Sequence, residues 1–288
     1  MCDELTEGDL DRVGLPVSRR GFAGLMAVGG AAFAAAAYAQ GVAERGRMVS
    51  IATADGTADA YFTHPARGKH PAVLIWPDIR GLRPAFRQMA DRLAGEGYAV
   101  LALNPFYRDA AGDVVQPTDD WTQPAIRERL FGYAGKLTRG AVARDATTIA
   151  AWLDKQKAVD TKRGIGVTGY CLGGPLTIFS AAAVPGRFKA CGSFHGSRQS
   201  NDTPTSPHLA IAETKAQYLF AIAENDDARD PAEKDRLNAA LAGRSGFNEV
   251  EVYAGAQHGW CPPDGRAYNE AAAEKAWGRM LALFKAAL

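Results

Sequence analysis

The stretch Gly169-Tyr170-Cys171-Leu172-Gly173-Gly174 decides how the rest of the sequence is interpreted. It joins an apolar run, residues 165–169, to a predicted helix over residues 175–183. At a tight turn between a strand and a helix, the central side chain stands clear of the sheet, and glycines two positions before and after it avoid steric collisions. The helix N-terminus favours negative charge, so it lowers the pKa of a thiol and helps to hold an oxyanion. We therefore predict that Cys171 is a nucleophile and not a buried structural cysteine.

Apolar runs alternate with helical patterns on both sides of this turn. Residues 72–76 read Ala-Val-Leu-Ile-Trp, which is typical of a strand buried on both faces, and residues 84–95 have helical spacing. The other predicted strands are 98–103, 165–169, 190–194, 218–223 and 250–253, and the other helices are 141–155, 175–183 and 268–287. Repeated βα units predict a single α/β domain whose mostly parallel sheet has helices on both faces. We expect the irregular segment 104–140 to lie over the carboxyl ends of the strands.

An acidic turn follows the strand 218–223, where the carboxylate that orients a catalytic base is expected. It reads Glu224-Asn225-Asp226-Asp227, and we predict Asp226 as the orienting acid. Asp227 is the second choice and Glu224 the third.

A histidine follows the next strand, in Gly255-Ala256-Gln257-His258-Gly259-Trp260. The chain order of nucleophile, acid and histidine makes His258 the predicted base. The weaker candidates either precede the nucleophile, end a strand or lie in an irregular stretch; they are His64, His70, His195 and His208. We expect the backbone amides of Leu172 and Ile79 to stabilise an oxyanion.

These segments together resemble the dienelactone hydrolase family, which has the α/β-hydrolase fold. The resemblance covers WPDIRGLRP (76–84), LNPFYR (103–108), GYCLGG (169–174), ENDD (224–227) and AQHGW (256–260). It implies a hydrolase acting on carboxylic ester bonds, of the carboxymethylenebutenolidase kind, with a small ester or lactone as substrate. By position, it implies Cys171 as nucleophile, Asp226 as orienter and His258 as base.

The resemblance also implies roles for residues near the substrate. Asp78 stands where dienelactone-cleaving members keep a glutamate that contacts the resting cysteine, and it is one methylene shorter. Arg108 lies near the family's arginine for the substrate carboxylate; the alternative is a surface arginine paired with Asp109 or Asp113. We assign Trp260 to the substrate site as well. A second carboxylate-binding arginine, expected after His258, is missing.

Composition excludes several other classes of protein. The chain has 288 residues, a formal net charge of +1 and no polybasic run, so we expect neither a nucleic-acid partner nor a membrane patch. No cluster has zinc spacing and no glycine loop has the phosphate-binding ending, so we expect no metal and no cofactor. Two alternatives stay open. The same triad could serve a general carboxylesterase or peptidase-like hydrolase, or the chain could be a non-catalytic small-molecule-binding protein of this fold.

The amino terminus resembles a twin-arginine export signal. Ser18-Arg19-Arg20-Gly21-Phe22 precedes a weakly apolar segment, and Ala37-Tyr38-Ala39 offers a cleavage site. We predict that residues 1–39 are removed and that residues 40–288 form the hydrolase domain in the periplasm; a membrane anchor is the alternative. Three cysteines would remain, so at least one is unpaired, although Cys191 and Cys261 could pair.

Overall fold

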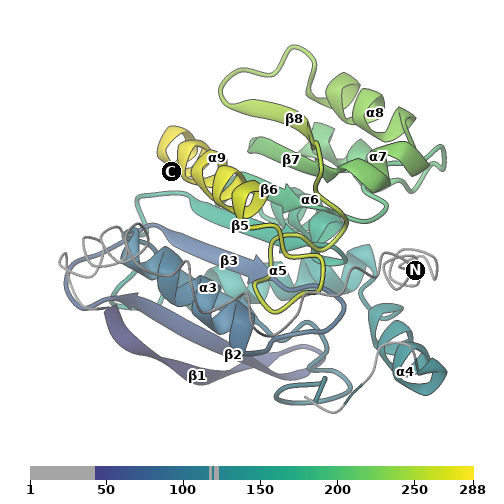
Figure 1. Cartoon of the computed structure of the whole chain (residues 1–288). Coiled ribbons are helices and arrows are strands. Elements are labelled where there is room, and N and C mark those ends of the chain that lie inside the picture. Colours follow the sequence, from purple (N-terminus) through teal and green to yellow (C-terminus); the bar gives the residue numbers. More distant parts are fainter. Residues whose placement is uncertain (1–42, 117–118, 120–122) are drawn as a thin grey trace, which may run out of the picture.

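The computed structural model describes residues 43–288, apart from 117–118 and 120–122 (Figure 1). The predicted export signal lies outside the described residues. The strands of the described part are β1 (Ala43–Thr53), β2 (Gly56–Pro65), β3 (Ala72–Trp76), β4 (Ala99–Leu103), β5 (Ile165–Tyr170), β6 (Phe188–Phe194), β7 (Gln217–Ala223) and β8 (Asn248–Tyr253). They form one sheet in the order β1-β2-β4-β3-β5-β6-β7-β8.

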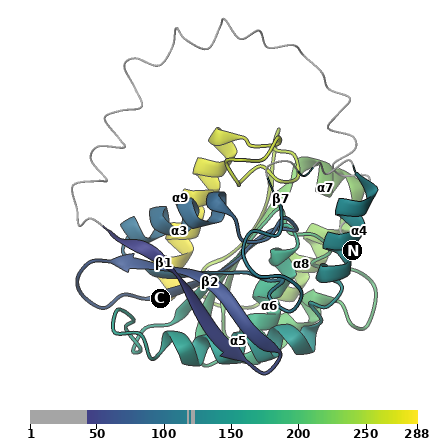
Figure 2. The same ribbon diagram turned by 90° about the horizontal axis from the view of Figure 1, so that it is seen from below.

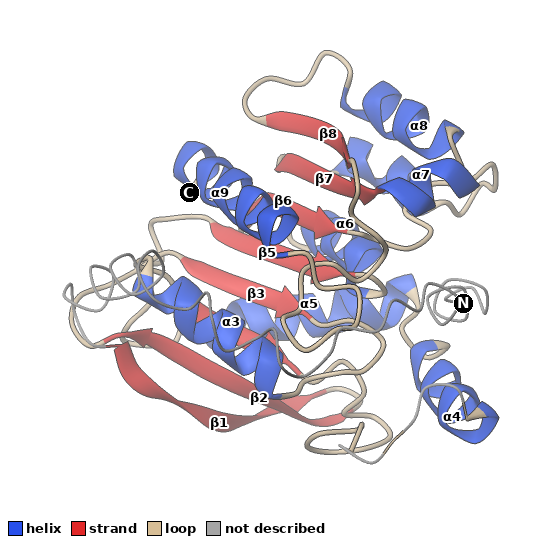
Figure 3. Ribbon diagram, viewed as in Figure 1, coloured by secondary structure: helices blue, strands red, loops and turns tan. Residues whose placement is uncertain are grey.

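From β3 onward, helices connect successive strands along the chain, and α9 follows the last strand (Figure 3). They are α3 (Pro84–Gly95), α4 (Pro124–Ala134), α5 (Arg139–Leu153), α6 (Gly173–Ala183), the 3-10 helix η2 (Pro207–Glu213), α7 (Glu224–Arg229), α8 (Ala232–Leu241) and α9 (Glu270–Ala287). No helix in the described ranges is both long and apolar enough to cross a membrane.

The sheet has a hydrophobic core on each face. Along β3, Val73 and Ile75 face one core, while Leu74 and Trp76 face the other, because successive side chains of a strand point to opposite faces. Helices α3 and α9 cover the first face, and α5, α6 and α8 cover the second (Figure 2). Burial on both faces explains the continuous apolar run that the sequence shows at β3.

Strands β4, β3, β5, β6, β7 and β8 are parallel neighbours. Their carboxyl ends therefore meet at one edge of the sheet, which is where ligands bind in open α/β sheets. The predicted α/β-hydrolase fold, a mostly parallel sheet with helices on both faces, is confirmed.

The hairpin of β1 and β2 was missed by the sequence analysis, which assigned no strand before residue 72. Both of its pairings, β1 with β2 and β2 with β4, are antiparallel. In β2, the buried residues Ala58, Ala60 and Phe62 each follow a less buried residue: Thr57, Asp59 and Tyr61. This period-2 pattern is typical of an antiparallel strand and was the available signal. The segment predicted to be irregular, 104–140, contains the helix α4 and the start of α5.

Candidate active site

Cys171 lies at the turn between β5 and α6. Its φ is 51°, in the left-handed region that side chains other than glycine rarely adopt. The turn is held by two backbone hydrogen bonds: the Cys171 N–H donates to the carbonyl of Phe194 (3.1 Å), and the Gly174 N–H donates to the carbonyl of Cys171 (3.0 Å). The strained backbone holds the thiol at the N-terminus of α6, at the carboxyl edge of the sheet.

The glycines around Cys171 are required by close backbone approaches. A Cβ at Gly169 would lie 2.0 Å from the carbonyl oxygen of Gly173. A Cβ at Gly173 would lie 2.3 Å from the carbonyl oxygen of Trp76, the last residue of β3. The second approach brings the start of α6 against the loop that follows β3. The predicted oxyanion amides, those of Leu172 and Ile79, belong to these two segments.

His258 lies in the loop after β8 and faces the acidic segment after β7. Its Nδ1 is 2.6 Å from Oδ2 of Asp226. Its backbone N–H donates to Oδ1 of Asn225 (2.8 Å), which fixes the loop against α7. Asn225 belongs to the acidic motif 224–227, and its role in holding the histidine loop was not predicted. The structure thus places Cys171, His258 and Asp226 at the ends of β5, β8 and β7.

The other two acids of the segment have different partners. Asp227 accepts hydrogen bonds from Lys234 (2.7 and 2.9 Å), and Glu224 accepts one from the Gly255 amide (3.1 Å). Asp226 is therefore the carboxylate of this segment that reaches His258. The segment forms the short helix α7, where the sequence analysis expected a turn.

The buried imidazole of His258 has an unusual pKa. Burial alone would lower this pKa, but the charge of the Cys171 thiolate, together with hydrogen bonds to Asp226 and Cys171, raises it well above its ordinary value. This direction favours a thiolate–imidazolium pair, in which each charge stabilises the other.

The two predicted oxyanion amides belong to residues outside helices and strands. Leu172 precedes the first residue of α6, and Ile79 lies in the loop after β3. Within the described ranges, neither N–H donates to a main-chain carbonyl. Both are available as donors, as an oxyanion hole requires.

Asp78 forms an ion pair with Arg83, an arginine without a predicted role. Arg83 binds both carboxylate oxygens of Asp78 (2.7 and 2.9 Å) and both of Asp264 (2.7 and 3.0 Å). The Arg80 amide also donates to Asp78 (2.9 Å). The carboxylate expected to contact the resting cysteine is thus held in an ion-pair cluster after β3.

Arg108 lies in a second cluster, after β4. Its guanidinium donates to Asp145 (2.7 and 2.9 Å) and to Asp55 (2.6 and 3.1 Å). Tyr107 donates to the same Asp145 (2.6 Å). This geometry favours the alternative interpretation, in which Arg108 pairs with aspartates. The two aspartates lie farther from Arg108 along the chain than expected. We do not assign Arg108 to the substrate.

Trp260 is fully buried behind the site. Its ring stacks on Tyr253 (centroids 5.2 Å apart) and meets His195 edge-on (5.0 Å). His195 in turn lies edge-on to His258 (5.1 Å). Burial and the nearby charge of His258 hold the pKa of His195 well below its ordinary value, so His195 is neutral. Trp260 therefore packs against His195 and Tyr253, a structural contact in place of the predicted substrate contact.

The other histidines and cysteines have local partners. His64, His70 and His208 bond to Pro65, to Gly97 and Arg67, and to Ser206, respectively. Among the described residues, Cys171, Cys191 and Cys261 form no disulfide bond, so Cys191 and Cys261 do not pair. Burial raises the pKa of both Cys191 and Cys261 well above the ordinary value of a thiol. No three acidic, histidine or cysteine side chains of the described part converge as a metal site would require.

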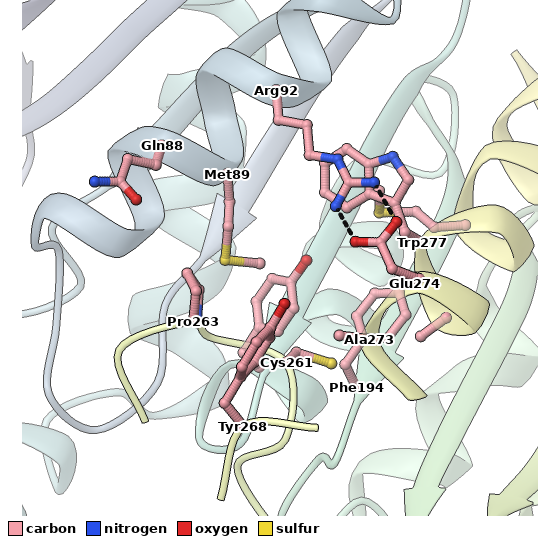
Figure 4. A pocket seen from close by; sticks show the side chains of 13 residues that line it. Gln88, Met89, Arg92, Phe194, Cys261, Pro263, Tyr268, Ala273, Glu274 and Trp277 are labelled. Carbon is pink, nitrogen blue, oxygen red and sulfur yellow. Dashed lines mark hydrogen bonds and ion pairs between the residues drawn. The ribbon is translucent and has the colours of Figure 1, made fainter. Parts of the chain in front are cut away.

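A cavity of about 200 Å³ lies between α3, α9 and the loop before α9 (Figure 4). Its lining includes Tyr170, Phe194, Met89, Cys261 and Trp277. Tyr170 directly precedes Cys171, but neither Cys171 nor His258 lines the cavity. The cavity therefore lies behind the strand that carries the nucleophile and is separate from the triad.

Comparisons with known proteins point to one family. Residues 58–288 match the family described as "Dienelactone hydrolase family". A protein of Escherichia coli (strain K12), provisionally named a carboxymethylenebutenolidase, is 28% identical over 243 residues, covering 83% of this chain and 86% of the relative. The carboxymethylenebutenolidase of Rhodococcus opacus is 27% identical over 235 residues, covering 80% and 87%.

Solved structures show the same fold. A crystal structure from Klebsiella pneumoniae, provisionally named a dienelactone hydrolase, superposes with a TM-score of 0.70 at 25% identity, covering 83% of this chain and 98% of the other. A dienelactone hydrolase from Anabaena variabilis superposes with a TM-score of 0.58 at 18% identity, covering 85% and 100%. The chain belongs to the dienelactone hydrolase family, and it is a hydrolase that acts on ester or lactone bonds.

Proposed function

We propose that this chain hydrolyses a small carboxylic ester or lactone with the Cys171 thiolate as nucleophile. One observation carries the proposal: His258 has the Asp226 carboxylate 2.6 Å from its Nδ1 and hydrogen bonds also to Cys171. This is the arrangement of nucleophile, base and orienting acid that nucleophilic catalysis requires. The carboxymethylenebutenolidase names of the relatives support a lactone as substrate.

In the first half of the reaction, the Cys171 thiolate attacks the substrate carbonyl carbon. The amides of Leu172 and Ile79 donate to the oxyanion that forms; losing one such donor typically costs about 3 kcal/mol of transition-state stabilisation. As the oxyanion collapses, the C–O bond breaks and the leaving oxygen takes a proton from His258. With a lactone, this oxygen stays attached to the acyl group because the ring opens.

In the second half, His258 removes a proton from water, which attacks the thioester carbonyl. The thiolate leaves, the carboxylic acid is released and His258 is again protonated beside Cys171. Asp226 keeps the imidazole oriented throughout and offsets its positive charge.

A hydrolysis screen tests the proposal. The full chain and its Cys171→Ala variant are assayed on lactones, short p-nitrophenyl esters and an acylated peptide, with Cys191→Ala as matched control. We expect lactones or esters to be turned over by the parent chain and Cys191→Ala, and a loss of at least about 10³-fold in Cys171→Ala. Undiminished hydrolysis by Cys171→Ala contradicts the proposal. Preference for the peptide would favour a peptidase-like hydrolase, and no turnover at all a binding protein.

We also propose that residues 1–39 direct export by the twin-arginine route and are then removed. The arginine pair Arg19-Arg20 and the small residues of Ala37-Tyr38-Ala39 support this. Intact-mass measurement on periplasmic protein should give a chain that begins at Gln40. A membrane-bound species that retains residues 1–39 would identify an anchor instead.

A further inference from the structure

The loop after β6, residues 195–200, is hydrogen-bonded directly to the backbone of Cys171. The Ser197 N–H donates to the carbonyl of Cys171 (3.0 Å), and the His195 N–H donates to the carbonyl of Ala221 on β7 (2.8 Å). Two of its residues have left-handed backbones, His195 (φ 40°) and Arg198 (φ 54°). Such strain persists where the surroundings hold it, often at functional sites. The loop is therefore fixed against the turn at Cys171.

The side chain of Ser197 reaches the reacting atom itself. Its Oγ lies 3.6 Å from Sγ of Cys171, which is hydrogen-bond distance for sulfur. A thiolate has no proton to donate, so the Ser197 hydroxyl is the donor whenever Cys171 is ionised. A hydrogen bond to an ionised acceptor is about twice as strong as one between neutral groups.

Asp78, the acidic side chain that the family resemblance places beside the cysteine, is bound by an arginine. Arg83 holds both carboxylate oxygens of Asp78. The groups that face Cys171 are instead the Ser197 hydroxyl, the N-terminus of α6 and the imidazole of His258, with the neutral His195 behind it. Of the described residues, Ser197 thus supplies a neutral donor that contacts the sulfur beside its histidine.

We propose that the Ser197 hydroxyl is a catalytic residue that donates a hydrogen bond to the Cys171 thiolate, both in the resting enzyme and when the thiolate leaves the thioester. The proposal rests on Cys171 being the nucleophile. When sulfur bonds to the substrate carbon, its negative charge moves to the carbonyl oxygen, and the hydrogen bond from Ser197 weakens. When the thioester is hydrolysed, the charge returns to sulfur and the hydrogen bond forms again.

Thiolate titration of the full chain tests this role in the absence of substrate. The variants are Ser197→Ala, which removes the hydroxyl, and Ser197→Thr, which keeps it. Ser200→Ala is the matched control. Ser200 lies in the same loop as Ser197, but its hydroxyl donates to the Glu233 carbonyl and accepts from Arg236, both on α8, and does not reach Cys171. Thiolate is followed by its ultraviolet absorbance against pH, and by the rate of iodoacetamide alkylation at Cys171, located by peptide mass.

We expect Ser197→Ala to raise the titration midpoint of Cys171 by about one pH unit, which lowers the thiolate fraction about tenfold below the midpoint. Ser197→Thr and Ser200→Ala should titrate like the parent chain. An unchanged midpoint in folded Ser197→Ala, or an equal shift in Ser200→Ala, overturns the proposal. If Ser197→Ala does not fold, Ser197→Gly removes the same hydroxyl and gives the same test.

The hydrolysis screen separates this proposal from the one on which it rests. If Cys171→Ala keeps full activity, the nucleophile assignment fails whatever Ser197 does. If Cys171→Ala is inactive and the Ser197→Ala midpoint is unchanged, the nucleophile stands and the role of Ser197 fails.

Discussion

Two groups of charged side chains lie at the carboxyl edge of the same sheet. The first contains arginines that stay charged when they are buried, and the second contains histidines whose pKa depends on their partners. After β3 and β4, the buried Arg83 and the partly buried Arg108 are each held between two carboxylates. After β5 to β8, His258 has a carboxylate on one side and a thiol on the other. In the described part of the chain, His195 beside it has no hydrogen-bond partner for either ring nitrogen.

The first group is suited to supporting the structure, and the second to chemistry. Arginine stays charged at every working pH, so an arginine paired with two acids holds loops together and does not titrate. Histidine and cysteine titrate near neutrality, so a partner decides which of their forms is stable. Burial and the nearby charge of His258 lower the pKa of His195, whereas Cys171 and Asp226 raise that of His258, although the two rings are 5.1 Å apart.

The sharpest test of the second group replaces Asp226 with asparagine. We expect Asp226→Asn to lower kcat by about 10³ to 10⁴-fold, because the imidazole loses its orienting charge. Asp227→Asn is the matched control, since Asp227 pairs with Lys234 and does not reach His258. Steady-state kinetics on the preferred ester measures both. Equal losses in the two variants would show that the segment acts as a whole and not through Asp226.

The first group is tested by Arg108→Ala, whose main effect we expect on stability. Removing this arginine leaves Asp145, only 1% exposed, without its countercharge and should cost about 3 kcal/mol in the free energy of unfolding. Urea denaturation measures this value, and Arg144→Ala, on a half-exposed arginine that also pairs with Asp55, should cost less. The change in kcat/KM should be the same on neutral esters and acidic lactones. A loss confined to acidic lactones would restore a substrate role for Arg108.

The smallest expected effect concerns Glu233, which accepts hydrogen bonds from the amides of Gln199 and Ser200 beneath the loop after β6. Burial raises its pKa to about 7, opposed by these amides and reinforced by Asp226 and Asp230. The unfolded chain loses this proton at lower pH than the folded chain. Stability should therefore fall as pH rises from about 4.5 to about 7, by about 1 to 3 kcal/mol.

Urea denaturation at pH 5 and pH 8 measures this decline. Glu233→Gln keeps an acceptor for the two amides and should lose most of the decline. Glu213→Gln, on an exposed glutamate of η2, should keep it. A decline of the same size in Glu233→Gln would place the titrating group elsewhere.

Local sequence was sufficient for most of the elements. The buried run of β3 and the glycine-flanked turn after β5 predicted their structures almost to the residue, because burial on both faces and close backbone approach restrict which residues are possible. The β1–β2 hairpin was missed because its exposed edge tolerates Arg47, Met48 and Ser50 among the apolar residues. Helix α7 was missed because its six residues bury no side chain.

The sequence by itself determined the α/β-hydrolase fold, the residues at each strand end and the order of nucleophile, acid and histidine. Periodicity and chain order are local properties, and parallel strands bring their carboxyl ends together without further information. Only the tertiary structure decided which acid reaches His258 and that Ser197 contacts Cys171. It also decided that Arg108 pairs with Asp145 and that Asp78 pairs with Arg83. Each of these depends on which side chains of distant loops come within hydrogen-bond distance, and such a choice leaves no periodic trace in the chain.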